Sequence, residues 1–375
     1  MINLDGTPYA ADQAGIDRLQ KLGNRIAEMR KVGKLDAKVL KHLRTYFRIK
    51  SIYHSNAIEG NRLNAGETRM VVEQGLTLTG KSLKDQAEAK NLSSALDYLE
   101  ELAADPTRPI TETDIRTIHS FVLRGLENDQ AGKYHTVPVE ISGSQFPPPR
   151  PEAVPGEMEG FSAWLVPASV PNEMISQTEG IVAAAIAHTW FVTIHPFVDG
   201  NGRVARLLMN LILMRYGFPI AIITKEDRIR YYDALETSQS SDLGPFLSLL
   251  EDCVEESFEE YAKAAEEQRA DQEWARSIAS KFDAKAKIRA ENEYEIWKNA
   301  VELLGGHVRA SVESVDESAR FGRVYYKDFG AIEFEKYVSL KSYESAKKTW
   351  FFRIDFVVGG RSDRYLFFLD HLVMT

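Results

Sequence analysis

The sequence has few of the features that mark secreted or nucleic-acid-binding proteins. It contains one cysteine, Cys253, so an intrachain disulfide cannot form and a disulfide scaffold is excluded. Its formal net charge is −9, so it lacks the basic surplus that sequence-independent nucleic-acid binding requires. We therefore expect no nucleic-acid partner. Cys253 lies in an apolar and acidic helical stretch, where we expect a buried and inert thiol.

Long uninterrupted apolar runs are also missing. Residues 1–15 lack a basic start followed by an apolar run, so no secretory signal is visible. The most apolar stretch, residues 207–224, contains Arg215, Gly217 and Pro219. These three residues interrupt a membrane span and suit a buried helix followed by a turn. The default expectation is a soluble cytoplasmic protein without membrane contact.

The remaining composition is that of a globular protein with more than one domain. The chain has 375 residues, of which 44% are hydrophobic, enough for two or three cores. Apolar residues recur at helical spacing up to about residue 268, and strand-like runs follow near the end. We predict a mainly α fold in four regions: an N-terminal helical region (1–105), a helical core (106–268), a charged linker helix (269–295) and a small β-rich (α+β) domain (296–375).

The strands of the last domain are predicted from alternating apolar residues. A turn at Gly359–Asp363 would join the last two strands as a hairpin. The predicted strands cover residues 307–315, 322–327, 350–358 and 365–372.

One short segment carries a dense set of chemically active residues, His195-Pro196-Phe197-Val198-Asp199-Gly200-Asn201-Gly202-Arg203-Val204-Ala205-Arg206. It stands between two apolar helical patterns, so we expect a loop that leads into a helix. Gly200, Asn201 and Gly202 can adopt positive φ angles and expose successive backbone N–H groups. Such N–H groups at the positive end of a helix dipole form an anion site.

The side chains of the segment suit the same anion site. Arg203 and Arg206 are three residues apart and share a helix face, and two guanidiniums suit a polyphosphate. Asp199 could hold Mg²⁺, which takes one or two carboxylates together with phosphate oxygens. His195 could accept the proton of an attacking hydroxyl. These are the parts that nucleotidyl or phosphoryl transfer requires.

The segment resembles the signature of the Fic family, His-x-Phe-x-(Asp/Glu)-Gly-Asn-Gly-Arg-x-x-Arg, at every specified position. With roughly 5% average usage per residue type, chance agreement is on the order of 10⁻¹⁰ per start position. The resemblance covers about residues 45–260. It implies a Fido-type helical bundle with a short β-hairpin flap, and AMP transfer from ATP with Mg²⁺ onto a Ser, Thr or Tyr hydroxyl. The acceptor would be a target protein or the chain itself, and a homodimer is common in the family.

The resemblance also implies a role for each residue of the segment. His195 is the general base, Phe197 anchors the loop in the core, and Asp199 positions Mg²⁺. Arg206 grips the γ-phosphate. The other phosphate contacts fall to Gly200, Asn201 (through its side chain as well), Gly202 and Arg203. The related Doc toxins are kinases with Lys at the position of Gly202, so this glycine favours AMP transfer over phosphate transfer.

Two further segments are similar to parts of the family. Residues 132–149 resemble the flap, in which Val139, Glu140 and Ile141 would form the strand that pairs with a target segment. The stretch that contains Tyr231 and Tyr232 resembles the helix whose tyrosines lie near the adenine. The flap departs from the usual pattern at His135 and at Gln145-Phe146, which leaves the target preference open.

An inhibitory motif lies upstream of the catalytic segment. Ser55-Asn56-Ala57-Ile58-Glu59-Gly60 resembles the family's (Ser/Thr)-x-x-x-Glu-(Gly/Asn) motif. The resemblance implies that Glu59 pairs with Arg206, which then cannot hold the γ-phosphate. ATP would bind with its α-phosphate badly placed for in-line attack, and position matters greatly for such transfers.

Other functions remain open at this stage. Glu59 could instead direct a water molecule at a modified side chain, which would make the protein an AMP-removing enzyme. The chain could also be a catalytically silent, nucleotide-binding regulator whose C-terminal domain binds a partner. A donor nucleotide other than ATP is a further alternative.

Overall fold

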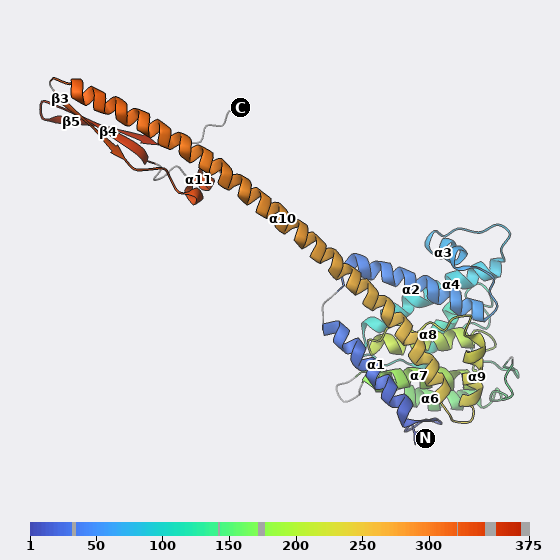
Figure 1. Cartoon of the computed structure of the whole chain (residues 1–375). Coiled ribbons are helices and arrows are strands. Elements are labelled where there is room, and N and C mark those ends of the chain that lie inside the picture. Colours follow the sequence, from blue (N-terminus) through green and yellow to red (C-terminus); the bar gives the residue numbers. More distant parts are fainter. Residues whose placement is uncertain (32–34, 142, 172–176, 321, 342–349, 369–375) are drawn as a thin grey trace. The chain divides into compact units, whose positions relative to one another are not determined.

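The computed structural model describes residues 1–31, 35–141, 143–171, 177–320, 322–341 and 350–368. They belong to two compact units, Met1–Arg269 and Ala270–Thr375 (Figure 1). The regions predicted as 1–105 and 106–268 lie together in the first unit. Those predicted as 269–295 and 296–375 lie in the second.

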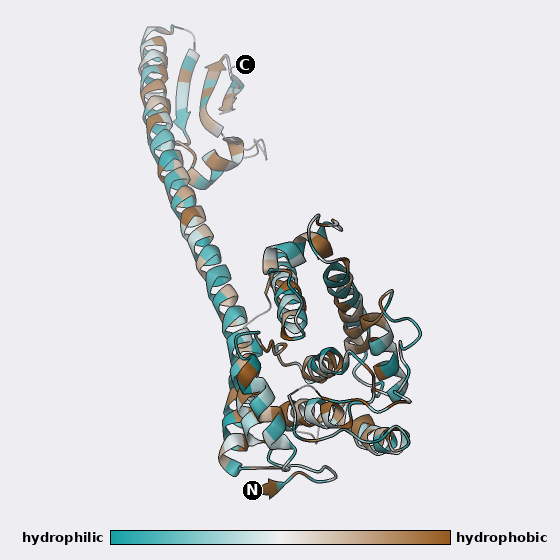
Figure 2. Cartoon of the chain, turned by 90° about the vertical axis from the view of Figure 1, so that its right-hand side faces the viewer, coloured by the Kyte–Doolittle hydropathy of each residue, from teal (hydrophilic) through white to brown (hydrophobic). Residues whose placement is uncertain are grey.

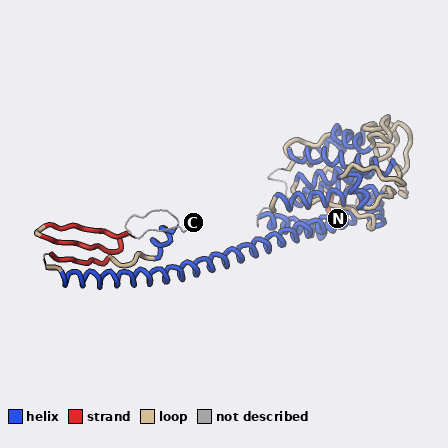
Figure 3. Tube along the Cα trace, turned by 90° about the horizontal axis from the view of Figure 1, so that it is seen from above, coloured by secondary structure: helices blue, strands red, loops and turns tan. Residues whose placement is uncertain are grey.

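The first unit is built almost entirely of helices (Figure 3). Two short antiparallel strands, β1 and β2, open it. Its elements are β1 (Ile2–Asn3), β2 (Ala10–Ala11), α1 (Gln13–Lys31), α2 (Ala37–Ile58), α3 (Ala65–Glu73), α4 (Leu83–Ala104), α5 (Glu112–Val122), α6 (Val154–Ala168), α7 (Gln177–Ile194), α8 (Asn201–Arg215), α9 (Arg228–Ser238) and the first part of α10 (Gly244–Ser318). The mainly α fold that the sequence predicts is confirmed.

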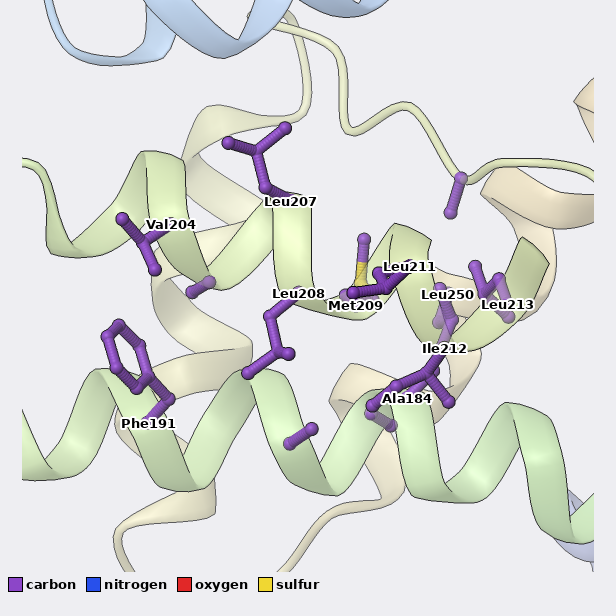
Figure 4. Close-up of a cluster of buried hydrophobic side chains, with 14 of the residues drawn as sticks. Ala184, Phe191, Val204, Leu207, Leu208, Met209, Leu211, Ile212, Leu213 and Leu250 are labelled. Carbon is purple, nitrogen blue, oxygen red and sulfur yellow. The ribbon is translucent and has the colours of Figure 1, made fainter. Parts of the chain in front are cut away.

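Helix α8 lies at the centre of this unit. It is apolar around most of its circumference, as expected of a helix that is buried on all sides. It packs on α7, α4 and α5, and Figure 4 shows Leu208 and Ile212 of α8 beside Phe191 and Ala184 of α7. The loop between α7 and α8 is therefore fixed at both ends by the core.

The start of α5 is held by a capping box. The Thr111 hydroxyl accepts a hydrogen bond from the Asp114 N–H, and the Asp114 carboxylate accepts one from the Thr111 N–H. This arrangement satisfies two N–H groups that a helix start leaves without partners. It fixes the helix that packs beneath the α7–α8 loop.

None of the described helices combines the length and apolar character needed to cross a membrane.

The second unit places a three-stranded antiparallel sheet beside a helix. The sheet has the order β3 (Gly322–Asp328), β4 (Trp350–Val358), β5 (Arg361–Phe368), and α11 (Phe334–Lys341) lies between β3 and β4 in sequence. Phe351 and Phe352 pack on Val301 of α10 in a small core, and Figures 1 and 3 show the strands along the last part of α10. In Figure 2 much of the long helix α10 is coloured hydrophilic.

One predicted strand of the second unit is wrong. Residues 307–315 belong to α10, which continues to Ser318. Val301, Val308 and Val312 recur at helical spacing and are buried or half-buried, whereas Ala310, which completes the apparent alternation, is exposed. The strands predicted at 322–327 and 350–358 are confirmed. The last strand begins at Arg361, earlier than predicted, so the turn shortens to Gly359–Gly360, and residues 369–372 lie outside the described residues.

Truncating the centre of the core gives a test of this packing. Leu208→Ala removes a fully buried side chain and should cost about 2–5 kcal/mol of stability. Leu83→Ala, at a position that is 72% exposed, should leave the thermal midpoint nearly unchanged. Equal shifts in thermal unfolding for the two variants would contradict the central place of α8.

Candidate active site

A cavity of about 280 Å³ opens at the start of α8. It brings together residues from the ends of α2 and α7, the α7–α8 loop, the flap segment and α9. The lining includes Glu59, Glu140, Ile141, Ser144, His195, Asp199, Gly200, Asn201, Gly202, Tyr231, Tyr232, Glu236 and Gln239. Residues that the sequence places as far apart as Glu59 and Gln239 thus face one space.

The α7–α8 loop is held by its own side chains. Phe197 is fully buried, and the Asn201 amide both accepts from the Phe197 N–H (3.0 Å) and donates to the Phe197 carbonyl (2.8 Å). The Asn201 side chain therefore braces the loop in this structure, which differs from the phosphate contact that the resemblance implies. Only Gly200 of the expected Gly-Asn-Gly nest has a positive φ angle, 83°. Asn201 and Gly202 already belong to α8.

His195 follows directly after α7 in a left-handed conformation, with φ 52°. Few residues other than glycine adopt this conformation, and it is found most often where function requires it. Burial lowers the pKa of His195 below its ordinary value of 6.5, although the backbone of Val192 and the charges of Glu59 and Asp199 act in the other direction. The imidazole is therefore neutral at pH 7 and can accept a proton.

Asp199 presents a charged carboxylate at the edge of the cavity. One oxygen accepts from the Gly200 N–H (2.6 Å) and the other from Arg203 Nη2 (3.1 Å). Burial alone would raise the pKa of Asp199, but Arg203 and the Gly200 N–H outweigh it, so the pKa is lowered. The described residues hold no cluster of three potential metal ligands. A single carboxylate still fits Mg²⁺, which completes its shell with phosphate oxygens and water.

Arg203 is buried between two carboxylates. Besides Asp199 it faces Glu88 of α4, with Nη1 3.4 Å from Oε1. The other Glu88 oxygen accepts from Asn61 Nδ2 at 2.8 Å, so the residue two places after Glu59 is linked to Arg203. The sequence analysis missed Glu88. The sequence signal that could have identified Glu88 is its helical spacing from Leu92, Ala95 and Leu99, which places an acidic residue on the apolar face of α4.

The guanidinium of Arg206 is enclosed by the end of α2. Nη2 lies 2.6 Å from Glu59 Oε1 and donates to the Ser55 carbonyl, while Nε donates to the Ser55 hydroxyl, both at 2.9 Å. Burial alone would lower the pKa of Arg206, but Glu59 outweighs it and the pKa is raised. Gly60, with φ 93°, ends α2 just beyond these contacts. The predicted pairing of Glu59 with Arg206 is present in the structure.

The two tyrosines of α9 have different surroundings. Tyr231 is fully buried, and its hydroxyl lies 3.4 Å from Arg206 Nη1 and 3.2 Å from His188 Nε2. Because arginine only donates, the Tyr231 hydroxyl accepts from Arg206 and is free to donate to His188. Tyr231 therefore belongs to the surroundings of Arg206. Tyr232 is 37% exposed and lines the cavity.

The flap segment is tied to α9. One Glu236 oxygen accepts from the Ser144 hydroxyl (2.7 Å) and the other from the Gln145 N–H (2.9 Å). Among the described residues 132–141 and 143–149 no strand is present, so the strand expected over Val139–Ile141 is not formed. The physical reason is the lack of a neighbouring strand, since ladder hydrogen bonds need a partner. The segment therefore lies at the rim of the cavity without a strand partner.

Comparisons with known proteins show the family of this chain. The family model described as "Fic/DOC family" matches residues 109–213. A solved structure of Fic-1 (residues 134–508) from Caenorhabditis elegans is 32% identical, with a TM-score of 0.57 over 68% of this chain and 72% of that one. The chain belongs to the Fic family. The α7–α8 loop described above lies within the matched Fic region.

Other Fic relatives match over similar lengths. The "Protein adenylyltransferase Fic" of Nematostella vectensis is 40% identical over 56% of this chain and 48% of its own length. A Fic-domain-containing signalling protein of Bacteroides thetaiotaomicron is 29% identical, with a TM-score of 0.57 over 67% of this chain and 97% of that one. The chain spans about half the length of the curated Fic proteins that it matches.

Gly202 offers a test of how closely Glu59 approaches α8. A Cβ at this position would lie 2.5 Å from Glu59 Oε1, too close for the carboxylate to remain on Arg206. Gly202→Ala should therefore lower the thermal midpoint of the chain that has Glu59. In the Glu59→Gly background the same change should raise it, because alanine is favoured over glycine in a helix by about 1 kcal/mol. Shifts of the same sign in both backgrounds would contradict the contact.

Proposed function

We propose that this Fic chain is a protein adenylyltransferase that moves AMP from ATP to a protein hydroxyl and is held inactive by Glu59. The observation that carries the proposal is the single cavity in which His195, Asp199 and the start of α8 meet the end of α2. The curated relatives named protein adenylyltransferase support the same activity. Each part of the reaction then has a residue that can perform it.

The reaction begins with the loss of a proton from the acceptor hydroxyl to His195. The hydroxyl oxygen forms a bond to the α-phosphorus of ATP, and the bond from that phosphorus to the bridging oxygen of the β-phosphate breaks. Pyrophosphate leaves with the electron pair. His195 lines the cavity, and burial keeps its ring neutral for this task.

The triphosphate would lie at the N-terminus of α8, where free N–H groups and the helix dipole favour negative charge. Arg206 lies on α8 three residues beyond Arg203 and would hold the γ-phosphate once released from Glu59. Asp199 would hold Mg²⁺ with the phosphates, and the bound ion would neutralise charge on the leaving pyrophosphate. Glu88 keeps Arg203 in place beside Asp199.

The inhibition follows from the contacts of Arg206. Each of its three nitrogens donates to Ser55, Glu59 or Tyr231, and the Glu59 carboxylate takes the place on the guanidinium that a γ-phosphate would need. A bias of 99 to 1 toward this arrangement requires about 2.7 kcal/mol. A charge-assisted hydrogen bond at a mostly buried guanidinium is of sufficient strength. Both the transfer and its inhibition therefore depend on one side chain.

The flap would present the acceptor. Glu140 and Ile141 line the cavity, and the segment from Val139 to Ile141 has no strand partner within the described chain. An extended segment of a target protein, or of this chain itself, could add to this edge as a strand and bring a Ser, Thr or Tyr hydroxyl to His195. Backbone hydrogen bonds would align the hydroxyl without requiring a particular sequence.

The central test removes the carboxylate of Glu59 from Arg206. Glu59→Gly should raise incorporation of label from [α-³²P]ATP, with Mg²⁺, into the chain and into lysate proteins about ten- to a hundredfold. Glu73→Gly is a matched control, since Glu73 also ends a helix and pairs with an arginine, Arg69. It should leave the rate unchanged. Adding His195→Ala to the Glu59→Gly variant should abolish the label.

The same assay separates the alternatives. Equal labelling by the wild-type and Glu59→Gly proteins would rule out the inhibitory role of Glu59. No labelling despite measurable ATP binding would contradict the transferase. Loss of AMP from a pre-labelled protein with wild type, abolished by Glu59→Gly, would assign AMP removal instead.

The pH dependence of the Glu59→Gly enzyme tests His195 as the base. The base must be neutral, so the rate should be constant near pH 7 and fall as pH drops through the pKa of His195. Burial places that pKa below 6.5, and loss of Glu59 removes one charge that raises it. The acid limb of kcat/KM should therefore be centred below pH 6.5. A limb centred above pH 6.5 would exclude this assignment.

A further inference from the structure

His119 of α5 lies at the junction between the catalytic loop and the flap, although no part of it lines the cavity. It is completely buried. Its Nδ1 accepts a hydrogen bond from the Gly132 N–H (2.8 Å), and its Nε2 lies 2.9 Å from the backbone carbonyl of Asp199. The ring also stacks flat on Phe197, with centroids 3.6 Å apart and planes 2° from parallel.

The two hydrogen bonds determine the state of the ring. Because the Gly132 N–H can only donate, Nδ1 must be unprotonated, and Nε2 must carry the hydrogen that it donates to the Asp199 carbonyl. Burial lowers the pKa of His119 to about 4, and the charge of Arg203 acts in the same direction. The ring is therefore neutral near pH 7, in one tautomer, and each nitrogen has a separate task.

One hydrogen bond of His119 supports Asp199, which would hold Mg²⁺, and the other supports the flap, which would present the acceptor. Asp199 turns its carbonyl toward His119 and its carboxylate toward Gly200 and Arg203, so the carbonyl contact holds the backbone from which the carboxylate extends. Gly132 is the first residue of the flap, and its carbonyl is held by Arg116 Nε at 2.7 Å. A Cβ at Gly132 would lie 2.5 Å from Ser120 Oγ, so the flap can approach α5 this closely only at a glycine.

We propose that His119 is a positioning residue that aligns the Asp199 carboxylate through Nε2 and the base of the flap through Nδ1. This inference rests on the proposed transfer of AMP, to which it adds a residue that touches neither nucleotide nor acceptor. A merely structural histidine would lower stability and all kinetic constants together. A positioning histidine with two separate tasks should give two separable defects.

A matched pair of amides separates the two nitrogens. In His119→Asn the side-chain oxygen can take the place of Nδ1, which preserves the Gly132 bond and removes the Asp199 bond. In His119→Gln the terminal nitrogen can take the place of Nε2, which preserves the Asp199 bond and removes the Gly132 bond. Both variants lose the aromatic stacking on Phe197 and are polar, so they control for each other.

The kinetics are measured in the Glu59→Gly background with a purified acceptor protein, while Mg²⁺ is varied. His119→Asn should lower kcat about ten- to a hundredfold and raise the Mg²⁺ concentration for half-maximal rate, because Asp199 is misdirected. Its KM for the acceptor should change little. His119→Gln should keep kcat within about threefold and raise the KM for the acceptor about fivefold, the effect of one hydrogen bond.

The outcome that overturns the proposal is equally definite. Parallel losses in both variants, or no change in either, would show that His119 serves only packing.

The ¹⁵N resonances of the His119 imidazole provide a readout that is independent of activity. They are recorded in the intact, otherwise wild-type chain and are assigned by their absence in His119→Asn. They should show the Nε2–H tautomer at pH 7, and the Nδ1–H tautomer or a charged ring would contradict the proposal. Absence of transfer in the Glu59→Gly reference itself would instead contradict the proposed function and leave the NMR test standing.

Discussion

The buried guanidinium of Arg206 is the constraint on which the site depends. A charge enclosed by protein must be paired, because leaving it without partners costs several kcal/mol. In this structure Ser55, Glu59 and Tyr231 provide the partners. In the proposed function a γ-phosphate would replace Glu59 on the same guanidinium, so nucleotide binding and loss of the Glu59 contact would be coupled by the need to keep one charge paired.

The rest of the first unit holds the loop and the flap around Arg206 in place. Helices α7 and α8 are buried along most of their length, so the loop between them has little freedom at either end. Three polar side chains then fix the loop and the flap: Asn201 holds Phe197, His119 holds Asp199 and Gly132, and Glu236 holds Ser144 and Gln145. Apart from the Ser144 hydroxyl, the groups that they hold belong to the backbone. The geometry of the site therefore depends on the fold more than on the residues that touch substrate.

The second unit has its own small core around Phe351 and Phe352. Its described residues contribute nothing to the lining of the cavity. The helix α10 belongs to both units, with its first part packed in the first and its last part beside the sheet. The residues to which the activity is assigned all belong to the first unit.

The sequence by itself determined the helical class and singled out residues 195–206. It could do so because helical spacing is a local pattern and because the motif residues lie within twelve positions of each other. The pairing of Glu59 with Arg206, which are far apart in sequence, follows only from the resemblance of residues 55–60 to the family's inhibitory motif. It mistook residues 307–315 for a strand, because a short apolar run fits both periods and only packing against the sheet decides between them. It also predicted a strand at Val139–Ile141, which needs a partner that the described chain does not supply.

Tertiary structure alone decided which polar residues support the site. Glu88, His119 and Glu236 lie outside the motif in sequence, and no local pattern says which groups each of them contacts. Their roles depend on which polar groups, in the backbone or in other side chains, lie within reach, and long-range packing sets those distances. The same packing turned the Asn201 amide toward Phe197 and buried Tyr231 against Arg206, because a side chain bonds to whatever the fold places beside it.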